Sequence, residues 1–331
     1  MTVLERSDDL ALTRLVTQAL FHARANGEAV AEAPYAGVPA RAEIPRLTTA
    51  IFGLGGHDVL VVRQRPAATK SWGPEQVLSP GPDENYDVFA FFLLTDDTGV
   101  STVLWTDASL ATIMTRSQLP GGQWSPAENL ANGTETVMGV GVGEGPHGQV
   151  AVSWASNDQG TKSVKVRLRD TGATSWTQEP AVIPQDADES PGAQTIAFNA
   201  HGDGVVIWAA EVPGDRLLRA SYYDVDADDP HWSEPVPVTS DAAGYTNMIQ
   251  AAVAPNGNVG LIWANGNLRV SAATYAAGSP DWSDPHPLGA SGSTLQVMPD
   301  VISDADGQFI AVWPDVWGIF EGAGITITDT N

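Results

Sequence analysis

The chain has 331 residues, with 16 Lys and Arg against 40 Asp and Glu, and its formal net charge is −24. Such acidity repels phosphate backbones and anionic lipid, so we expect neither nucleic-acid nor membrane partners, although the same charge also keeps a large surface soluble. There is no cysteine, which excludes disulfides, thiolate nucleophiles and Cys-ligated zinc. The N-terminus has no basic start followed by an apolar block, and no apolar run could span a bilayer, so we expect a cytoplasmic protein.

The first two strands of a repeating unit are marked by a glycine that is followed six residues later by a tryptophan. Each glycine lies in a turn such as "APNG" or "DADG", which favours a residue tolerant of positive φ. The following Val- and Ile-rich residues predict strand B, and the residues before the turn predict strand A. The glycines are 49, 54, 55 and 50 residues apart, a period typical of propeller blades. The pairs are Gly99/Trp105, Gly148/Trp154, Gly202/Trp208, Gly257/Trp263 and Gly307/Trp313.

A second tryptophan opens a W-S-x-P corner, as in "HWSEPVPVTS" (residues 231–240). Strand C, such as "VKVRLRD", precedes this corner, and strand D follows it. Each repeat is therefore predicted to form a four-stranded antiparallel sheet, the unit of a propeller blade. Because both tryptophan series recur at fixed places, we expect them to fill the wedge between neighbouring blades. The corner tryptophans are Trp72, Trp124, Trp176, Trp232 and Trp282.

The repeats extend over the whole chain, at approximately residues 9–82, 83–133, 134–187, 188–241, 242–290 and 291–331. The first repeat is degenerate, with Gly27 at the turn and Ala33 in place of the tryptophan, and it carries an insertion at approximately 34–55. The last repeat ends before its fourth strand, and residues 2–8 are placed to supply that strand and close the ring. The predicted fold is one all-β domain (1–331), a six-bladed β-propeller with four antiparallel strands per blade.

This repeat resembles the six-bladed propeller architecture, which includes fucose-binding fungal lectins, calcium-dependent lactonases, sialidases and hetero-Diels–Alder cyclases. The likeness is to an architecture and not to one family. Propeller lectins use an Arg, an acidic residue and an aromatic at each blade interface, whereas Gly, Trp, Ser and Pro recur here. Sialidases need an arginine triad, but the strand C arginines follow outer-strand spacing (Arg116, Arg167, Arg169 and Arg219). A lactonase-like calcium site is the least contradicted of these resemblances.

In a propeller, strand A lines the axis, and the D–A and B–C connections share one face where function usually lies. The residues seven before each turn glycine differ in every repeat, and so do those five before it. The first set is Leu20, Phe92, Gly141, Thr195, Gln250 and Asp300; the second is His22, Leu94, Gly143, Ala197, Ala252 and Ile302. This divergence on a constant scaffold predicts one asymmetric axial site. The alternative is that the inner strands vary only in their packing.

Candidate residues follow from this placement. Asp300 is a candidate general acid or base, Tyr86 and Tyr245 are candidate hydrogen-bond donors to a carbonyl, and His22 is the one histidine on an inner strand. The predicted ligand-binding residues are Trp317, Phe320, Gln250, Asn247, Gln194, Gln296, Asp87 and Tyr35. Further polar residues at this face are Glu135, Thr136, Asp107, Glu211 and Asp315, and the insertion adds Arg41 and Arg46 on a segment long enough to form a lid.

No metalloprotease, hydrolase, P-loop or dinucleotide motif occurs, so we expect no redox cofactor. We hypothesise an enzyme that holds one largely apolar organic molecule in the axial pocket: a cyclase, isomerase or lyase of bacterial specialised metabolism. The first alternative is a non-catalytic binding module, either a carbohydrate lectin or a protein-interaction propeller. The second is a calcium-dependent, lactonase-like hydrolase, the one hypothesis that needs Ca²⁺. The expected partner is a small molecule, and the protein is expected to be a monomer or a weak oligomer.

Overall fold

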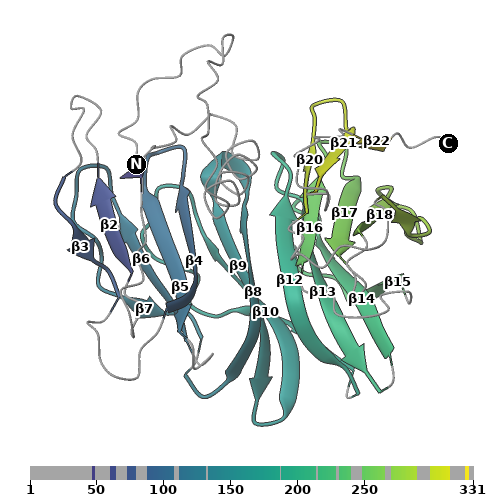
Figure 1. The fold of residues 1–331 in the computed structure, drawn as a ribbon, viewed down its shortest axis with the longest axis horizontal. Coiled ribbons are helices and arrows are strands. Elements are labelled where there is room, and N and C mark those ends of the chain that lie inside the picture. Colours follow the sequence, from purple (N-terminus) through teal and green to yellow (C-terminus); the bar gives the residue numbers. More distant parts are fainter. Residues whose placement is uncertain are drawn as a thin grey trace, which may run out of the picture.

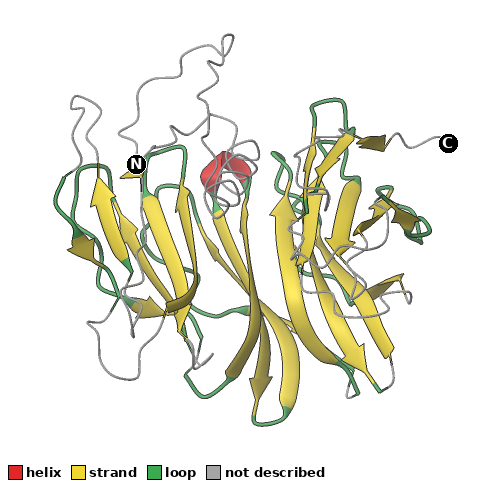
Figure 2. Ribbon diagram, viewed as in Figure 1, coloured by secondary structure: helices red, strands yellow, loops and turns green. Residues whose placement is uncertain are grey.

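The computed structural model describes residues 47–48, 60–64, 73–79, 88–107, 112–131, 133–186, 188–213, 215–228, 231–239, 248–264, 270–288, 299–313 and 325–327. These residues form antiparallel β-strands, and their one helical element is the short 3-10 turn η1 (Pro146–Gly148) (Figure 2). The described part of the chain is therefore all-β, as the alternating apolar pattern predicts.

Six sheets follow one another in chain order, and within each sheet every strand pairs with its neighbour in the sequence (Figure 1). The first sheet contains β1 (Leu47–Thr48), β2 (Val61–Gln64) and β3 (Gln76–Val77). The next two contain β4 (Val88–Thr95), β5 (Ser101–Asp107), β6 (Ile113–Gln118) and β7 (Glu128–Asn129), then β8 (Thr136–Glu144), β9 (Val150–Asp158), β10 (Thr161–Arg169) and β11 (Ala181–Pro184).

The remaining sheets contain β12 (Ser190–Phe198), β13 (Gly204–Val212), β14 (Asp215–Tyr223) and β15 (Val236–Thr239); β16 (Met248–Val253), β17 (Val259–Ala264), β18 (Val270–Tyr275) and β19 (His286–Pro287); and β20 (Asp300–Ser303), β21 (Phe309–Val312) and β22 (Ile325–Ile327). The four-stranded unit is thus confirmed in the four central sheets. Six blades in a closed ring stay a prediction, because residues 2–8 and Gly27 lie outside the described residues. Part of the predicted insertion belongs to a sheet, since Leu47 pairs with Gln64 and Thr48 with Arg63.

The buried cores of the described residues each lie between two consecutive sheets, and tryptophan occupies them as predicted. Four strand-B tryptophans, Trp105, Trp154, Trp208 and Trp263, are at most 1% exposed. Each packs on the preceding sheet; Trp154, for example, shares a core with Leu94 and Leu104. The corner tryptophans Trp124, Trp176, Trp232 and Trp282 pack on the same four cores. Trp72 lies outside the described residues.

The A–B turns require their glycines. Gly99, Gly148, Gly202, Gly257 and Gly307 have φ values of 86°, 80°, 115°, 82° and 84°, in the region that residues with a Cβ rarely adopt. In the first of these turns the Asp96 carboxylate accepts hydrogen bonds from the N–H groups of Thr98 and Val100. Such turns reverse the chain between strand A and strand B in each repeat.

The W-S-x-P corner is explained by its hydroxyl group. Ser233 N–H donates to the Tyr222 carbonyl (2.8 Å), and the Ser233 hydroxyl accepts the Tyr222 N–H (3.0 Å), so a side chain replaces a backbone carbonyl of the sheet ladder. The same hydroxyl donates to the Glu234 carbonyl, where the chain turns towards a proline. Ser125 and Ser283 repeat this arrangement at their corners. The motif therefore keeps strand C hydrogen-bonded while the chain changes direction.

A buried ion pair joins the second and third sheets. Arg169 at the end of β10 lies 3.3 Å from the carboxylate of Asp96, which belongs to the turn after β4, and both side chains are 0% exposed. Burial raises the pKa of Asp96, yet hydrogen bonds and the Arg169 charge outweigh burial and hold this pKa below its usual value. Those bonds come from Gly172 N–H, Thr98 and Val100 N–H. The pair links segments 73 residues apart and stabilises the contact between the two sheets.

Candidate functional site

A buried carboxylate–cation pair lies in the β8–β11 sheet, at the end where the D–A and B–C connections meet. Glu135, directly before β8, is 3% exposed, and its Oε2 lies 2.6 Å from Lys165 Nζ on β10. The Ser156 hydroxyl near the end of β9 donates to the same oxygen. Three strands thus hold one carboxylate in place, which satisfies its charge away from water.

The β12–β15 sheet carries a second pair at the matching position. Arg219 on β14 donates from Nε to both carboxylate oxygens of Glu189, at 3.1 and 3.3 Å, and also from Nη2. Lys165 is paired in register with Trp154, and Arg219 with Trp208, so the two cations are equivalent. In both repeats the carboxylate stands 13 residues before the turn glycine, and the cation 30 residues after the carboxylate.

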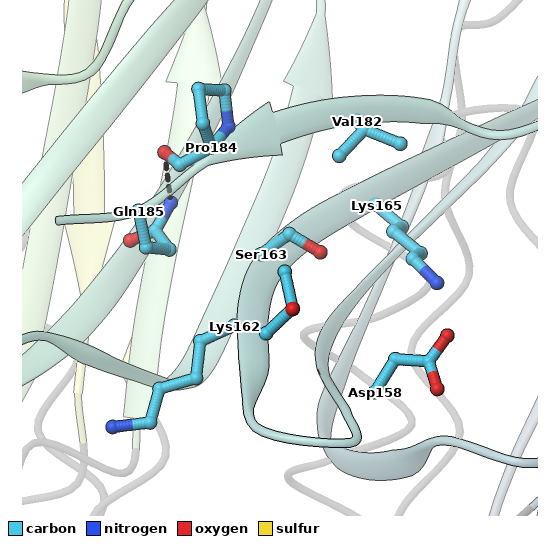
Figure 3. A pocket seen from close by; sticks show the side chains of 8 residues that line it. Asp158, Lys162, Ser163, Lys165, Val182, Pro184 and Gln185 are labelled. Atoms are coloured by element: carbon cyan, nitrogen blue, oxygen red, sulfur yellow. Dashed lines mark hydrogen bonds between the residues drawn. The ribbon is translucent and has the colours of Figure 1, made fainter. Parts of the chain in front are cut away.

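An open groove of about 370 Å³ borders β10 and β11, and we call it the β10–β11 groove (Figure 3). Val182, 59% exposed, gives it a small apolar surface together with Pro184. Lys165 and Asp158 lie at one end in this view, and Lys162 and Gln185 lie at the other. The full lining is Asp158, Thr161, Lys162, Ser163, Lys165, Val182, Pro184 and Gln185.

Two contacts join the Lys162 end of the groove to the next sheet. Lys162 Nζ donates to the hydroxyl of Ser190 at the start of β12, at 2.6 Å. The side-chain oxygen of Gln185 accepts a hydrogen bond from Trp208 Nε1 at 2.9 Å, and its amide nitrogen bonds the Pro184 carbonyl. The groove therefore rests on rigid strands and on a fully buried tryptophan, which limits its freedom to change shape.

Three of the predicted site residues are described, and they do not line this groove. Gln194 on β12 is buried and donates to the Gly139 carbonyl at 3.2 Å, which makes it a contact between adjacent A strands. Asp300 begins β20 and is 6% exposed, with Oδ1 accepting the Val301 N–H at 2.9 Å. Gln250 lies half-buried on β16. The described structure brings no two of these residues into contact.

The other candidates have varied outcomes. Glu135 is the buried partner of Lys165, Glu211 is exposed and ion-paired with Arg216, and Thr136 is exposed. Asp107 ends β5, and its side chain is not described. Tyr86, Asp87, Tyr245, Asn247, Gln296, Asp315, Trp317, Phe320, His22, Tyr35, Arg41 and Arg46 lie outside the described residues. Their predicted roles stay predictions.

Packing explains part of the divergence along the A strands. A Cβ on Gly143 would stand 2.4 Å from the Ile196 carbonyl oxygen, and one on Gly139 would stand 2.8 Å from the Gly192 carbonyl oxygen. A Cβ on Gly141 would meet the Ser153 hydroxyl at 2.7 Å. The glycines of β8 therefore allow the backbone of β12 to approach closely. At this sheet, packing accounts for residues whose divergence suggested an axial site.

Sequence reasoning missed Glu189, Lys165 and the pairing role of Arg219, which was interpreted as an outer-strand residue. The signal that could have found them is the double spacing of 13 and 30 residues, present in two repeats only. Among the described residues, no group of three or more histidines and carboxylates is arranged to hold a metal ion. Those residues also contain no helix that is long and apolar enough to cross a membrane.

No protein-family model matches the sequence, and no curated protein matches it. Solved structures do resemble the chain. The BP39L lectin from Burkholderia pseudomallei has 14% identity and a TM-score of 0.56, over 87% of this chain and 82% of the lectin. A protein of unknown function from Dyadobacter fermentans has 15% identity and a TM-score of 0.51, over 84% of each chain. The fold is propeller-like.

A third structure, an alpha-L-arabinanase from Penicillium chrysogenum, has 10% identity and a TM-score of 0.47, over 72% of this chain and 80% of the arabinanase. At such identities the likeness concerns the fold alone. The chemistry of a propeller-like fold depends on the residues that its loops and outer strands present, because one scaffold supports many functions. Any function must therefore be argued from the groove and its neighbours.

Proposed function

We propose that the protein is a saccharide-binding propeller, and that its binding site is the β10–β11 groove. The observation that carries the proposal is the composition of this groove, which surrounds a small apolar surface with hydrogen-bonding groups. A sugar presents the same combination, because its hydroxyls donate and accept while its C–H faces are apolar. A volume of about 370 Å³ lies within the range of small-ligand sites.

The lining supplies both halves of the hydrogen bonds that a sugar needs. Lys162 and Lys165 only donate, and the Asp158 carboxylate accepts. Thr161, Ser163 and Gln185 can do either. Val182 and Pro184 offer contact to a C–H face. Because no aromatic ring lines the groove, we expect a dissociation constant near ~1 mM for a monosaccharide.

The propeller-like fold supports the proposal, since a lectin shares it. The fold does not choose the ligand, and the groove is what favours a polyhydroxylated one. The hypothesis of a cyclase, isomerase or lyase with an axial pocket depends on Tyr86, Tyr245 and Trp317, which lie outside the described residues. It stays a prediction, and no described contact favours it over saccharide binding.

The test is binding of the full chain to a glycan array, followed by saturation-transfer NMR titration of the best monosaccharides. Val182→Asn should weaken binding about fivefold, because it replaces the apolar surface of the groove. The matched control is Val77→Asn, since Val77 is also a half-exposed valine on an outer strand, β3. Both variants should keep the wild-type melting temperature. Absence of saccharide binding up to about tenfold above the expected millimolar constant, or equal loss in both variants, would overturn the proposal.

A further inference from the structure

Lys162 is unusual in this chain because no carboxylate neutralises it. The structure describes eight lysine and arginine side chains, and six of them lie within 4.0 Å of a carboxylate. Lys162 lacks such a partner among the described residues, although the chain contains 40 Asp and Glu. Its printed contact is the neutral Ser190 hydroxyl. An ammonium group has three donors, so two remain for a ligand.

The β12–β15 sheet shows how the same position is neutralised elsewhere. Arg216 on β14 is paired in register with Glu211 on β13, and their side chains form an ion pair. In the β8–β11 sheet, Lys162 is paired in register with Asn157, which has no charge. Asn157 instead accepts the Gly160 N–H in the hairpin turn, at 2.9 Å. One uncharged residue therefore leaves a cation uncompensated beside the groove.

We propose that the β10–β11 groove selects an acidic saccharide, a sugar with one carboxylate such as a uronic acid, and that Lys162 determines this specificity. The inference rests on the proposed function and names its ligand class. A carboxylate on the sugar would complete the donors of Lys162 with charge-assisted hydrogen bonds, which are stronger than those to a neutral hydroxyl. Ser190 fixes the ammonium group, so little side-chain freedom is lost on binding.

The surroundings limit the ligand to low charge. Asp158 lines the groove, and Asp186 and Asp188 are exposed on the connection that leads to Ser190, although none lies within 4.0 Å of Lys162. The whole chain carries a net charge of −24. A polysulfated chain would be repelled by this field over much of its length, whereas a single carboxylate gains locally from one cation.

The experiment compares matched sugars that differ only at C6, D-galacturonate with D-galactose and D-glucuronate with D-glucose, by NMR titration of the full chain. We expect the acid to bind about tenfold more tightly in at least one pair. Lys162→Gln should remove this preference and leave the neutral sugar within about twofold of wild type. Raised salt should weaken the acid more than the neutral sugar.

A second variant keeps the lysine and supplies the missing acid. Asn157→Glu recreates the Glu211–Arg216 arrangement and should abolish the preference, while Asn157→Gln, equal in size but uncharged, should keep it. Arg216→Gln is the control in the other sheet and should change nothing. Equal affinity for both members of every pair overturns the inference and leaves the proposed function standing. An unchanged preference in Asn157→Glu also overturns it, and failure of every sugar to bind overturns both.

Discussion

The β8–β11 sheet and the β12–β15 sheet share a buried strand-B tryptophan, a corner tryptophan and a carboxylate–cation pair. They differ at both ends. At the hairpin end, Lys162 faces Asn157 where Arg216 faces Glu211. At the turn end, the charged pair Asp96–Arg169 binds one sheet to its predecessor, whereas neutral Asn199 donates to the Ala254 carbonyl in the sheet that follows. The scaffold is thus constant while charge is distributed anew in each repeat.

The largest expected effect tests the shared scaffold. Trp154→Ala and Trp208→Ala should each lower the free energy of unfolding by about 3–5 kcal/mol, because each removes a fully buried indole. Chemical denaturation followed by circular dichroism measures this loss. Trp208→Phe should cost about 1 kcal/mol more than Trp154→Phe, since only Trp208 has a described hydrogen-bond partner, Gln185. Equal costs for the two phenylalanine variants would remove that difference between the sheets.

The next effect tests the charged contact between sheets. Asp96→Asn should cost about 3 kcal/mol, because it leaves the Arg169 charge buried without its carboxylate. The folded-state pKa of Asp96 is lowered, so its contribution is present above the unfolded value of 3.8 and is lost as the pH falls through the folded value.

Wild-type melting temperature should therefore fall below about pH 4, and Asp96→Asn should show a shallower fall. The neutral counterpart supplies the control, since Asn199→Ala should leave the acid dependence as in wild type. A parallel pH dependence in wild type and Asp96→Asn would contradict the importance given to this ion pair.

The smallest effect compares the corners of the two sheets. Ser233→Ala should cost about 1 kcal/mol, because the Tyr222 N–H loses its acceptor at 3.0 Å. Thr177→Ala should cost about half as much, since the corresponding bond to Leu168 N–H is longer, at 3.3 Å, and exposed to water. Differential scanning calorimetry resolves such differences. The reverse order of the two costs would show that the hydroxyl does not replace a ladder acceptor.

The repeat could be predicted from the sequence because its landmarks have strict physical requirements. Only glycine suits the positive φ at Gly202, and only a large ring fills the space that Trp208 occupies. The candidate groove could not be predicted in this way. Glu135 and Lys165 meet through strand register over 30 residues, and the importance of Lys162 depends on what Asn157 lacks. Such features arise from three-dimensional neighbours and leave no periodic pattern.

The cores that join only consecutive sheets have an evolutionary consequence. Each core is shared by one sheet and its chain neighbour, so a block of about 50 residues brings half of two interfaces with it. Gene duplication or loss of one such block would join surfaces that already fit. Blade copies can then acquire separate mutations, and a single substitution like the one at Asn157 can give one copy a new ligand while its siblings maintain the architecture.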